Sequence, residues 1–335
     1  MLSRVIDESR INELKKLIFA SNNIVITCHV SPDGDAIGSS LALWHILLSL
    51  GKTVKVITPD QPPKSLFFLP GISDIDIYSC NPDKVEKLIK KSDLIICLDF
   101  NTISRIDKLG DIVIESRAKK VMIDHHLYPD AFSDVLISYP EVSSTCALLY
   151  YVISQIGLYE SMDVNAAQCL YTGMMTDTGN FSYNSCDPDL YIIISKLLKK
   201  GINKDEIYTY VYNTNTESSL RINGYALSKK MELNFQKGVA ILSLNKQELD
   251  EYNYKKGDTE GLVNVPLSIP GISCSVFFRE DNDFIKVSMR SKGEFYVNTI
   301  CEQYFNGGGH KNAAGGEFYG SLNEAVEIFR SIFEK

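Results

Sequence analysis

Several features that mark large protein classes are missing from this sequence of 335 residues. Its longest apolar run, residues 41–50, is about half the length of a membrane-spanning helix and contains His45. No Gly-x-x-x-x-Gly-Lys-Ser/Thr segment is present, so a nucleoside-triphosphate motor is not indicated. The eight cysteines include no Cys-x-x-Cys pair, which argues against a zinc knuckle or a dithiol redox centre. We therefore expect a globular protein without a membrane span.

We also expect no secretion signal. Residues 1–8 contain no apolar core of the kind that such signals carry. The cysteines are scattered singly and mostly fall inside apolar segments, as Cys28, Cys97 and Cys169 do, so buried free thiols are expected. Free thiols fit a reducing compartment, and we expect a cytoplasmic location.

The chain has fewer basic than acidic residues. The chain has 34 Lys and Arg against 42 Asp and Glu, a formal net charge of −8. This balance argues against a protein that binds long duplex nucleic acid, because backbone binding needs a basic patch. Short anionic substrates stay open, since divalent cations in a pocket add positive charge where the substrate binds.

Strand-like and helix-like segments alternate through the first half of the chain. Short continuous apolar runs predict strands, and such unbroken strands are typical of a parallel sheet covered on both faces. We therefore expect an α/β fold with a doubly wound, mainly parallel sheet. The expected strands are 24–28, 53–57, 93–98 and 120–123, and the expected helices are 39–50, 143–156, 163–175 and 190–200.

The second half has a different pattern. Two apolar segments around the acidic turn 280–283 predict a hairpin of strands. The length of the chain fits two domains, and the Asn/Thr-rich stretch near 213–216 suits a connection between them. We expect a first domain over 1–190, a linker over 191–220 and a smaller α/β domain over 221–335. The elements expected in the second domain are strands 239–243, 273–279 and 284–289, and helices from 246, over 297–305 and over 323–333.

Side chains that commonly bind metals follow two of the expected strands. His29 stands at the end of the first strand, and Asp33 and Asp35 lie in the turn after it. An Asp-Gly turn alone is usually only a turn, but three such side chains within seven residues favour a metal site. Asp99 ends another strand, where a carboxylate can bridge two cations. Because open α/β sheets bind ligands beyond the carboxyl ends of their strands, we expect these residues to converge.

Two further segments supply the same chemistry. In Asp124-His125-His126, adjacent side chains of extended backbone point to opposite sides. One histidine can then bind metal while the other faces substrate, with Asp124 orienting an imidazole. Ordinary surface histidines are the alternative interpretation. Asp177 ends a helix, where its charge opposes the helix dipole unless a cation compensates. Oxygen and nitrogen ligands of this kind suit Mn²⁺ or Mg²⁺.

A glycine-rich segment far downstream suits a phosphate. Gly307, Gly308 and Gly309 precede His310, and small residues let backbone amides approach a phosphate closely. Arg290 suits a bidentate contact with phosphate oxygens. We expect a flexible glycine loop that binds substrate, with His310 and Arg290 as its cationic contacts.

Together, these motifs resemble those of one known family. The Asp-His-His triplet, the His-x-x-x-Asp-Gly-Asp-Ala segment and the Gly-Gly-Gly-His segment followed by Ala-Ala-Gly are similar to the motifs of DHH/DHHA1 phosphoesterases, in the branch of nanoRNases and pAp phosphatases. The resemblance covers nearly the whole chain. It implies an N-terminal DHH domain, a smaller C-terminal DHHA1 domain and an active site in the cleft between them.

The resemblance also implies a role for each motif residue and a preference for two Mn²⁺ ions, although the ligand chemistry alone allows Mg²⁺. The expected ligands of one ion are His29, Asp33 and Asp99. The expected ligands of the other are Asp35, Asp99, His125 and Asp177. The residues expected to act in catalysis are Asp99, Asp124, His125 and His126. The expected substrate contacts are His126, Arg290, Gly307, Gly308, Gly309 and His310.

The expected activity is two-metal phosphoester hydrolysis, in which hydroxide attacks phosphorus in line. The resemblance implies two substrates: short oligoribonucleotides, cut to 5′-mononucleotides, and adenosine 3′,5′-bisphosphate (pAp), converted to AMP. Cyclic di-AMP or its linear product pApA is the nearest alternative. A nucleotide sensor that does not cleave is another, and it predicts a broken ligand position, which the sequence does not show. The preferred substrate and a homodimer are left open.

Overall fold

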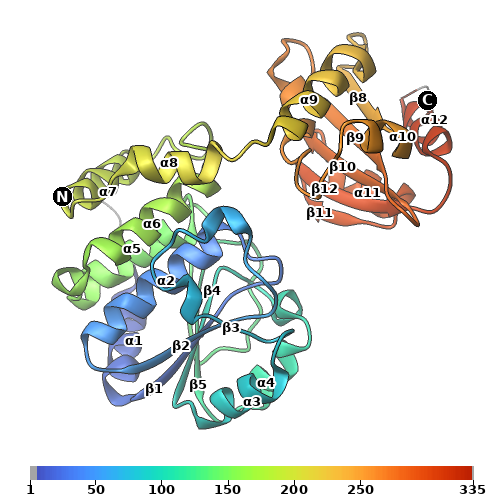
Figure 1. Ribbon diagram of the computed structural model, residues 1–335. Helices are drawn as coiled ribbons and strands as arrows, with labels where there is room; N and C mark the ends of the chain where they lie inside the picture. The colour runs from blue at the N-terminus through green and yellow to red at the C-terminus, as the bar shows by residue number, and fades with distance from the viewer. Residues whose placement is uncertain (1–5, 334–335) are drawn as a thin grey trace. The chain divides into compact units, whose positions relative to one another are not determined.

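The computed structural model describes residues 6–333 of the chain (Figure 1). It divides into two compact units, Met1–Thr214 and Asn215–Lys335. Each unit has its own sheet and its own apolar core. Within residues 6–333, none of the helices combines the length and the apolar character that crossing a bilayer requires.

The first unit contains a six-stranded sheet in which every neighbouring pair is parallel. Its strand order, β3-β2-β1-β4-β5-β6, proceeds outward in both directions from β1 and β4, which is the doubly wound arrangement. The expected α/β fold with a mainly parallel sheet is confirmed. The strands are β1 (Asn23–Thr27), β2 (Thr53–Thr58), β3 (Asp76–Ile77), β4 (Leu94–Leu98), β5 (Lys119–Asp124) and β6 (Val135–Ser138).

Helices cover both faces of this sheet (Figure 1), because successive strand side chains point to opposite sides. In β1, Ile24 and Ile26 join the larger core with α1, α2, α5 and α6, whereas Val25 joins the smaller core with α3 and α4. The helices of this unit are α1 (Glu8–Ala20), α2 (Gly34–Ser49), α3 (Pro82–Lys91), α4 (Leu109–Glu115), α5 (Thr145–Ile156), α6 (Val164–Asp177), α7 (Pro188–Lys199) and α8 (Lys204–Tyr212).

Helix α2 begins earlier than its apolar spacing indicates. The expected start is residue 39, but the helix starts at Gly34. The reason is its N-cap: Asp33 Oδ1 accepts hydrogen bonds from the backbone N–H groups of Asp35 and Ala36, both at 3.0 Å. Asp35 therefore lies in the first turn of a buried helix rather than in the loop before it.

Helices α2 and α6 touch through glycines. A Cβ added at Gly38 of α2 would lie 2.5 Å from the backbone oxygen of Cys169 in α6. One added at Gly173 of α6 would lie 2.2 Å from Cys146 Sγ and 2.9 Å from Asp35 Oδ1. The backbones of the two helices can approach this closely only because both positions lack a side chain.

We expect Gly38→Ala to lower the free energy of unfolding of the first unit by about 1–3 kcal/mol, because the added methyl must push the two helices apart. Urea denaturation followed by circular dichroism measures this change. The matched control is Gly224→Ala in α9 (Glu217–Tyr225), where no atom lies within 4 Å of the added Cβ. That variant should gain about 0.5–1 kcal/mol. Equal stability of Gly38→Ala and the wild type would contradict the close contact.

The linker expected over 191–220 is mostly helical. Helices α7 and α8 belong to the first unit, and α8 is held there by Tyr212, whose hydroxyl donates to Met175 O at 3.4 Å, and by Tyr210, which stacks on Phe68. The boundary between the two units falls between Thr214 and Asn215, in the short polar stretch of chain between α8 and α9. Ile207 of α8 is buried in the core of the first unit, which a linker would not require.

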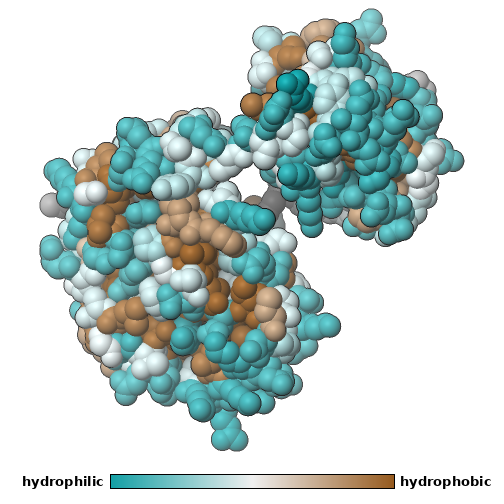
Figure 2. All heavy atoms as spheres, in the orientation of Figure 1, coloured by the Kyte–Doolittle hydropathy of each residue, from teal (hydrophilic) through white to brown (hydrophobic). Residues whose placement is uncertain are grey.

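The second unit is built on a six-stranded sheet of order β11-β12-β10-β9-β8-β7, in which only β8 and β9 are parallel. The expected hairpin is present as β9 and β10. Helices α11 and α12 pack on one face of the sheet, and α9 and α10 on the other. Hydrophilic residues dominate the side of this unit seen in Figure 2. The strands are β7 (Glu232–Asn234), β8 (Val239–Leu244), β9 (Cys274–Glu280), β10 (Ile285–Ser291), β11 (Gly308–His310) and β12 (Ala313–Phe318), and the remaining helices are α10 (Lys246–Glu251), α11 (Val297–Tyr304) and α12 (Leu322–Ile332).

The glycine segment is not the flexible loop that the sequence suggests. Gly308–His310 forms β11, an edge strand paired with β12. A Cβ at Gly307 would lie 2.0 Å from the backbone oxygen of Gly315, and one at Gly309 would lie 2.6 Å from that of Ala313. Gly309 also has φ +142°, which favours glycine. Close approach of two strands therefore explains two of the three glycines.

Candidate active site

Three neighbouring strands of the first sheet end at one edge, and candidate ligands follow each of them. His29 comes two residues after β1, Asp99 directly after β4 and His125 directly after β5. These strands are adjacent and parallel, so their carboxyl ends meet. Asp35 reaches the same place from the first turn of α2, and Asp177 reaches it as the last residue of α6. Residues far apart in sequence thus form one cluster.

The structure brings all six predicted metal ligands together. They form overlapping groups in which the ligand atoms lie within 4.8 Å of one another. Asp99 and His125 each belong to two of the groups, and together they link all three. The groups are His29, Asp33 and Asp99; Asp35, His125 and Asp177; and Asp99, His125 and His126.

Two histidines present one ring nitrogen to the cluster and anchor the other. His29 Nδ1 lies 2.7 Å from Val30 O, and His29 Nε2 lies 3.5 Å from Asp99 Oδ2. His125 Nδ1 lies 3.1 Å from Val142 O, and its Nε2 lies 3.7 Å from Asp99 Oδ1. A carbonyl oxygen can only accept, so Nδ1 carries the proton in both rings. Burial alone would lower the pKa of both imidazoles, but without a cation Asp99 raises it. When the rings lose the Nε2 proton, the Nε2 lone pair faces the cluster, as a metal ligand requires.

The third histidine is held differently. His126 Nδ1 lies 2.7 Å from Asp124 Oδ1, and the His126 backbone N–H donates to Asp124 Oδ2 at 2.9 Å. Asp124 is fully buried at the end of β5. The expected orienting carboxylate is therefore present, and the imidazole it orients is that of His126, whereas a backbone carbonyl orients His125.

Negative charge is crowded in this cluster. Burial raises the pKa of Asp35, and the charges of Asp99 and Asp177 raise it further. Burial also raises the pKa of Asp177 to about 7, against an opposing effect of His125. Asp99 differs: burial alone would raise its pKa, but a hydrogen bond from His29 and the charge of His125 lower it to about 2. Divalent cations would relieve the repulsion between these carboxylates, so the donor set fits hard cations.

Asp99 also has an unusual backbone. Its φ is +64°, in the left-handed region that few residues other than glycine and asparagine adopt readily. Its N–H donates to Ile123 O at 3.2 Å, which ties it to the neighbouring strand β5. Such conformations cost roughly 1–3 kcal/mol and persist where the surroundings enforce them. The conformation turns the carboxylate sharply out of the strand direction and into the cluster.

One contributing residue was missed by sequence reasoning. Thr145, the first residue of α5, is buried, and its hydroxyl donates to Asp99 Oδ1 at 2.8 Å. Its backbone N–H donates to Asp35 Oδ2 at 2.6 Å, and that of Cys146 donates to Asp35 Oδ1 at 2.8 Å. The local signal is a run of hydroxyl residues before an apolar helix, which indicates only an N-cap.

The predicted substrate contacts lie in the second unit. Arg290 is in β10, where its Nη1 donates to Met289 O at 2.9 Å. Arg290 and His310 are both paired with Ala313 of β12, so the backbone register places these residues in one row across the sheet. The side chain of His310 lies outside the described part of the structure. The substrate roles of Arg290 and of residues 307–310, and the expected cleft between the domains, stay predictions.

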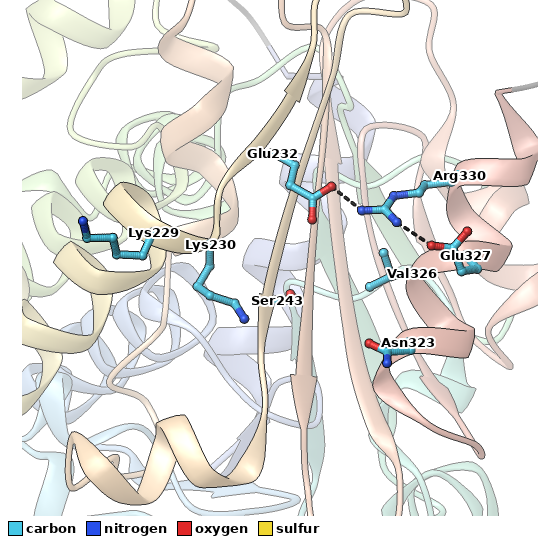
Figure 3. Close-up of a pocket in the computed structure, with 8 residues that line it drawn as sticks. All are labelled: Lys229, Lys230, Glu232, Ser243, Asn323, Val326, Glu327 and Arg330. Atoms are coloured by element: carbon cyan, nitrogen blue, oxygen red, sulfur yellow. Dashed lines mark hydrogen bonds and ion pairs between the residues drawn. The ribbon is translucent and has the colours of Figure 1, made fainter.

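A separate cavity of about 260 Å³ in the second unit lies away from this row (Figure 3). Its most prominent cation, Arg330, forms ion pairs with Glu232 and Glu327. Lys230 pairs with Glu248 at 2.8 Å. Arg330 and Lys230 are thus paired with carboxylates of the protein, and Lys229 is the third cation of the lining.

Comparisons with known proteins show the family of the chain. Residues 23–174 match the model for the DHH family, N-terminal domain, and residues 236–335 match that for the DHHA1 domain. The chain is 30% identical over 322 residues to the bifunctional oligoribonuclease and PAP phosphatase NrnA of Bacillus subtilis, covering 96% of each protein. The chain belongs to the DHH family.

Two further proteins are similar to this chain over different shares of their own length. A crystal structure of an exopolyphosphatase-related protein from Bacteroides fragilis has 49% identity and a TM-score of 0.97, covering 99% of this chain and 98% of that one. The cyclic-di-AMP phosphodiesterase GdpP of Bacillus subtilis is 25% identical over 337 aligned positions, an alignment that covers 96% of this chain but 49% of GdpP. The two-unit architecture is thus that of DHH proteins with a DHHA1 domain.

Proposed function

We propose that this protein is a metal-dependent phosphoesterase that hydrolyses short oligoribonucleotides to 5′-mononucleotides and removes the 3′-phosphate of pAp. The observation that carries the proposal is the cluster centred on Asp99, in which all six ligand positions are filled and converge. The similarity to the bifunctional NrnA over nearly the full length of both proteins supports this substrate class.

The residues of the cluster would hold two divalent cations, with Asp99 shared between them. Such ions polarise phosphoryl oxygens and make water nucleophilic at neutral pH. His29 and Asp33 would complete one ligand set with Asp99, and the other would draw on the group around His125. Mn²⁺ is the ion we expect, with Mg²⁺ as the alternative of the same ligand preference.

The remaining site residues would act on the substrate directly. Asp124 fixes the His126 ring by binding its Nδ1 atom. We therefore assign the other ring nitrogen, His126 Nε2, to a phosphoryl oxygen of the substrate. Arg290 would contact a second phosphate with its guanidinium fork, which matches phosphate oxygens in geometry. Contacts with two phosphates would suffice for a short substrate, which needs no extended basic surface of the kind that a long strand requires.

The test is an assay of the full chain with Mn²⁺ or Mg²⁺ on di- to pentanucleotides and on pAp, with chromatographic identification of the products. We expect 5′-mononucleotides from the former and AMP from the latter. The absence of turnover of both would overturn the proposal. Metal analysis belongs beside the assay, because one bound ion or none would favour a sensor that binds nucleotides without cleaving them.

Cyclic di-AMP and pApA form the second candidate substrate class, favoured by the similarity to GdpP. The chain spans only about half of GdpP, whereas it spans nearly all of NrnA, so we rank this class below the first. A comparison of kcat/KM for pAp, pApA, cyclic di-AMP and a dinucleotide decides the order. Polyphosphate should be included in the same comparison, given the exopolyphosphatase-related protein from Bacteroides fragilis.

A further inference from the structure

The first turn of α5 makes hydrogen bonds to both fully buried carboxylates of the cluster. Asp35 is 1% exposed and Asp99 is 2% exposed. Both oxygens of Asp35 accept backbone N–H groups, from Thr145 and from Cys146. Asp99 receives the Thr145 hydroxyl at 2.8 Å. Thr145 is therefore a single residue bonded to two carboxylates that come from different elements.

Helix capping does not account for this threonine. The N-cap of α5 is Ser144, whose side chain accepts from the Ala147 N–H at 3.0 Å. The Thr145 hydroxyl is thus not needed to satisfy the helix end. A hydroxyl at this position would otherwise bond to a nearby backbone group, as Thr172 does in α6 with Gln168 O. In Thr145 it points to Asp99, 46 residues away in sequence.

The geometry explains why the orientation of Asp99 needs support. A carboxylate has about four lone-pair directions, and a shared ligand must point one oxygen at each cation. Asp99 Oδ2 lies 3.5 Å from His29 Nε2, and Oδ1 lies 3.7 Å from His125 Nε2, so each oxygen already faces one half of the cluster. The Thr145 hydroxyl takes one direction of Oδ1 and limits rotation of the carboxylate about its Cβ–Cγ bond.

We propose that Thr145 is a positioning residue that fixes Asp99 relative to Asp35 and thereby sets the affinity of the cluster for its divalent cations. The inference rests on the proposed function only in assigning cations to this cluster. Thr145 does not touch substrate in this role, and it acts through the two carboxylates. Groups that orient metal ligands in this way typically contribute 10–100-fold to metal affinity or activity.

The experiment measures Mn²⁺ affinity by isothermal titration calorimetry on chelator-treated full-length protein, with kcat and KM on the best substrate. Thr145→Val removes the hydroxyl and keeps the shape, and we expect Mn²⁺ affinity to fall by about 10–100-fold. Thr145→Ser keeps the hydroxyl and should stay within about threefold of the wild type. Thr145→Ala removes the hydroxyl and also the γ-methyl group, and it repeats the test in case the valine variant does not fold. Thr172→Val is the matched control for loss of a buried hydroxyl, and its Mn²⁺ affinity should be unchanged.

The outcomes separate this inference from the proposed function. Weaker Mn²⁺ binding in Thr145→Val or Thr145→Ala, with recovery in Thr145→Ser, supports the positioning role, especially if kcat falls at saturating substrate while KM is little changed. Wild-type affinity in the folded hydroxyl-free variants overturns it and leaves the phosphoesterase proposal intact. Absence of Mn²⁺ and Mg²⁺ binding by the wild-type protein overturns both.

Discussion

Asp99→Asn is expected to reduce phosphoester hydrolysis by at least about 1,000-fold, or ~4 kcal/mol of transition-state stabilisation. Asp99 is the ligand that we propose the two cations share, so its loss affects both proposed cation positions at once. Asparagine keeps the size of the side chain and adopts left-handed backbone more readily than most residues, which suits φ +64°. The substitution thus removes the negative charge and leaves the fold in place.

The same strand supplies a matched control. Asp93 directly precedes β4, and Asp99 directly follows it. Asp93 Oδ2 accepts hydrogen bonds from the backbone N–H groups of Asn22 and Asn23, at 3.0 and 2.8 Å. Asp93→Asn is expected to cost about 1 kcal/mol of stability through these weakened hydrogen bonds and to leave hydrolysis unchanged. The measurements are initial rates with Mn²⁺ and thermal melting of both variants. Substantial hydrolysis by folded Asp99→Asn would show that the cluster is not the catalytic centre.

The sequence was sufficient to predict the position of the ligands because strand ends are local features. An apolar run followed by a polar side chain identifies the end of a strand, and parallel strands put those ends at one edge of the sheet. His29, Asp99 and His125 could therefore be expected to lie together at this edge from the sequence alone. Asp35 was also expected at this edge, in the turn after the first strand, whereas Asp177 was predicted on its chemistry. The structure adds that helices α2 and α6 carry these two residues to the edge.

What the sequence did not reveal depends on contacts between distant segments. The hydrogen bonds of Thr145 to Asp35 and Asp99 join residues that are 110 and 46 positions apart, and no local pattern encodes them. The same holds for the left-handed backbone of Asp99, which its surroundings enforce. The glycine segment was expected to be flexible because glycine density alone does not distinguish a loop from a strand in close contact with its neighbour, as Gly307 is with Gly315.

Asp177→Asn is expected to have opposite effects on stability and activity. In chelator-treated protein at pH 8, we expect it to raise the melting temperature of the first unit by about 2–4 °C, corresponding to on the order of 1 kcal/mol. With Mn²⁺ present, we expect hydrolysis to fall by about 100-fold, or ~2.7 kcal/mol, because a cation loses one carboxylate ligand. Asp177 also stands at the C-terminal end of α6, where the helix dipole disfavours a negative charge.

The pH dependence of the stabilisation follows from the pKa of Asp177. Burial, with a further contribution from Asp99, raises this pKa from 3.8 to about 7 in the folded protein. Because the folded value exceeds the unfolded one, the favourable effect of the protonated carboxyl is complete below about pH 4 and is lost as the pH rises through about 7. Asparagine cannot ionise, so the advantage of the variant in chelator should appear at pH 8 and disappear near pH 4.

The opposite end of the same helix provides the control. Asp163 is the N-cap of α6 and accepts the Ala166 N–H at 2.8 Å, and asparagine caps helices about as well as aspartate. Asp163→Asn should therefore leave activity unchanged and lower the melting temperature slightly, since it removes a charge that the dipole favours. The wild type, Asp163→Asn and Asp177→Asn are each melted at pH 4 and at pH 8, with chelator and with Mn²⁺. The contrary result is a lower melting temperature for Asp177→Asn than for the wild type in chelator at pH 8. That result would mean that repulsion among the carboxylates does not destabilise the metal-free protein. The charge argument for a divalent metal centre would then fail.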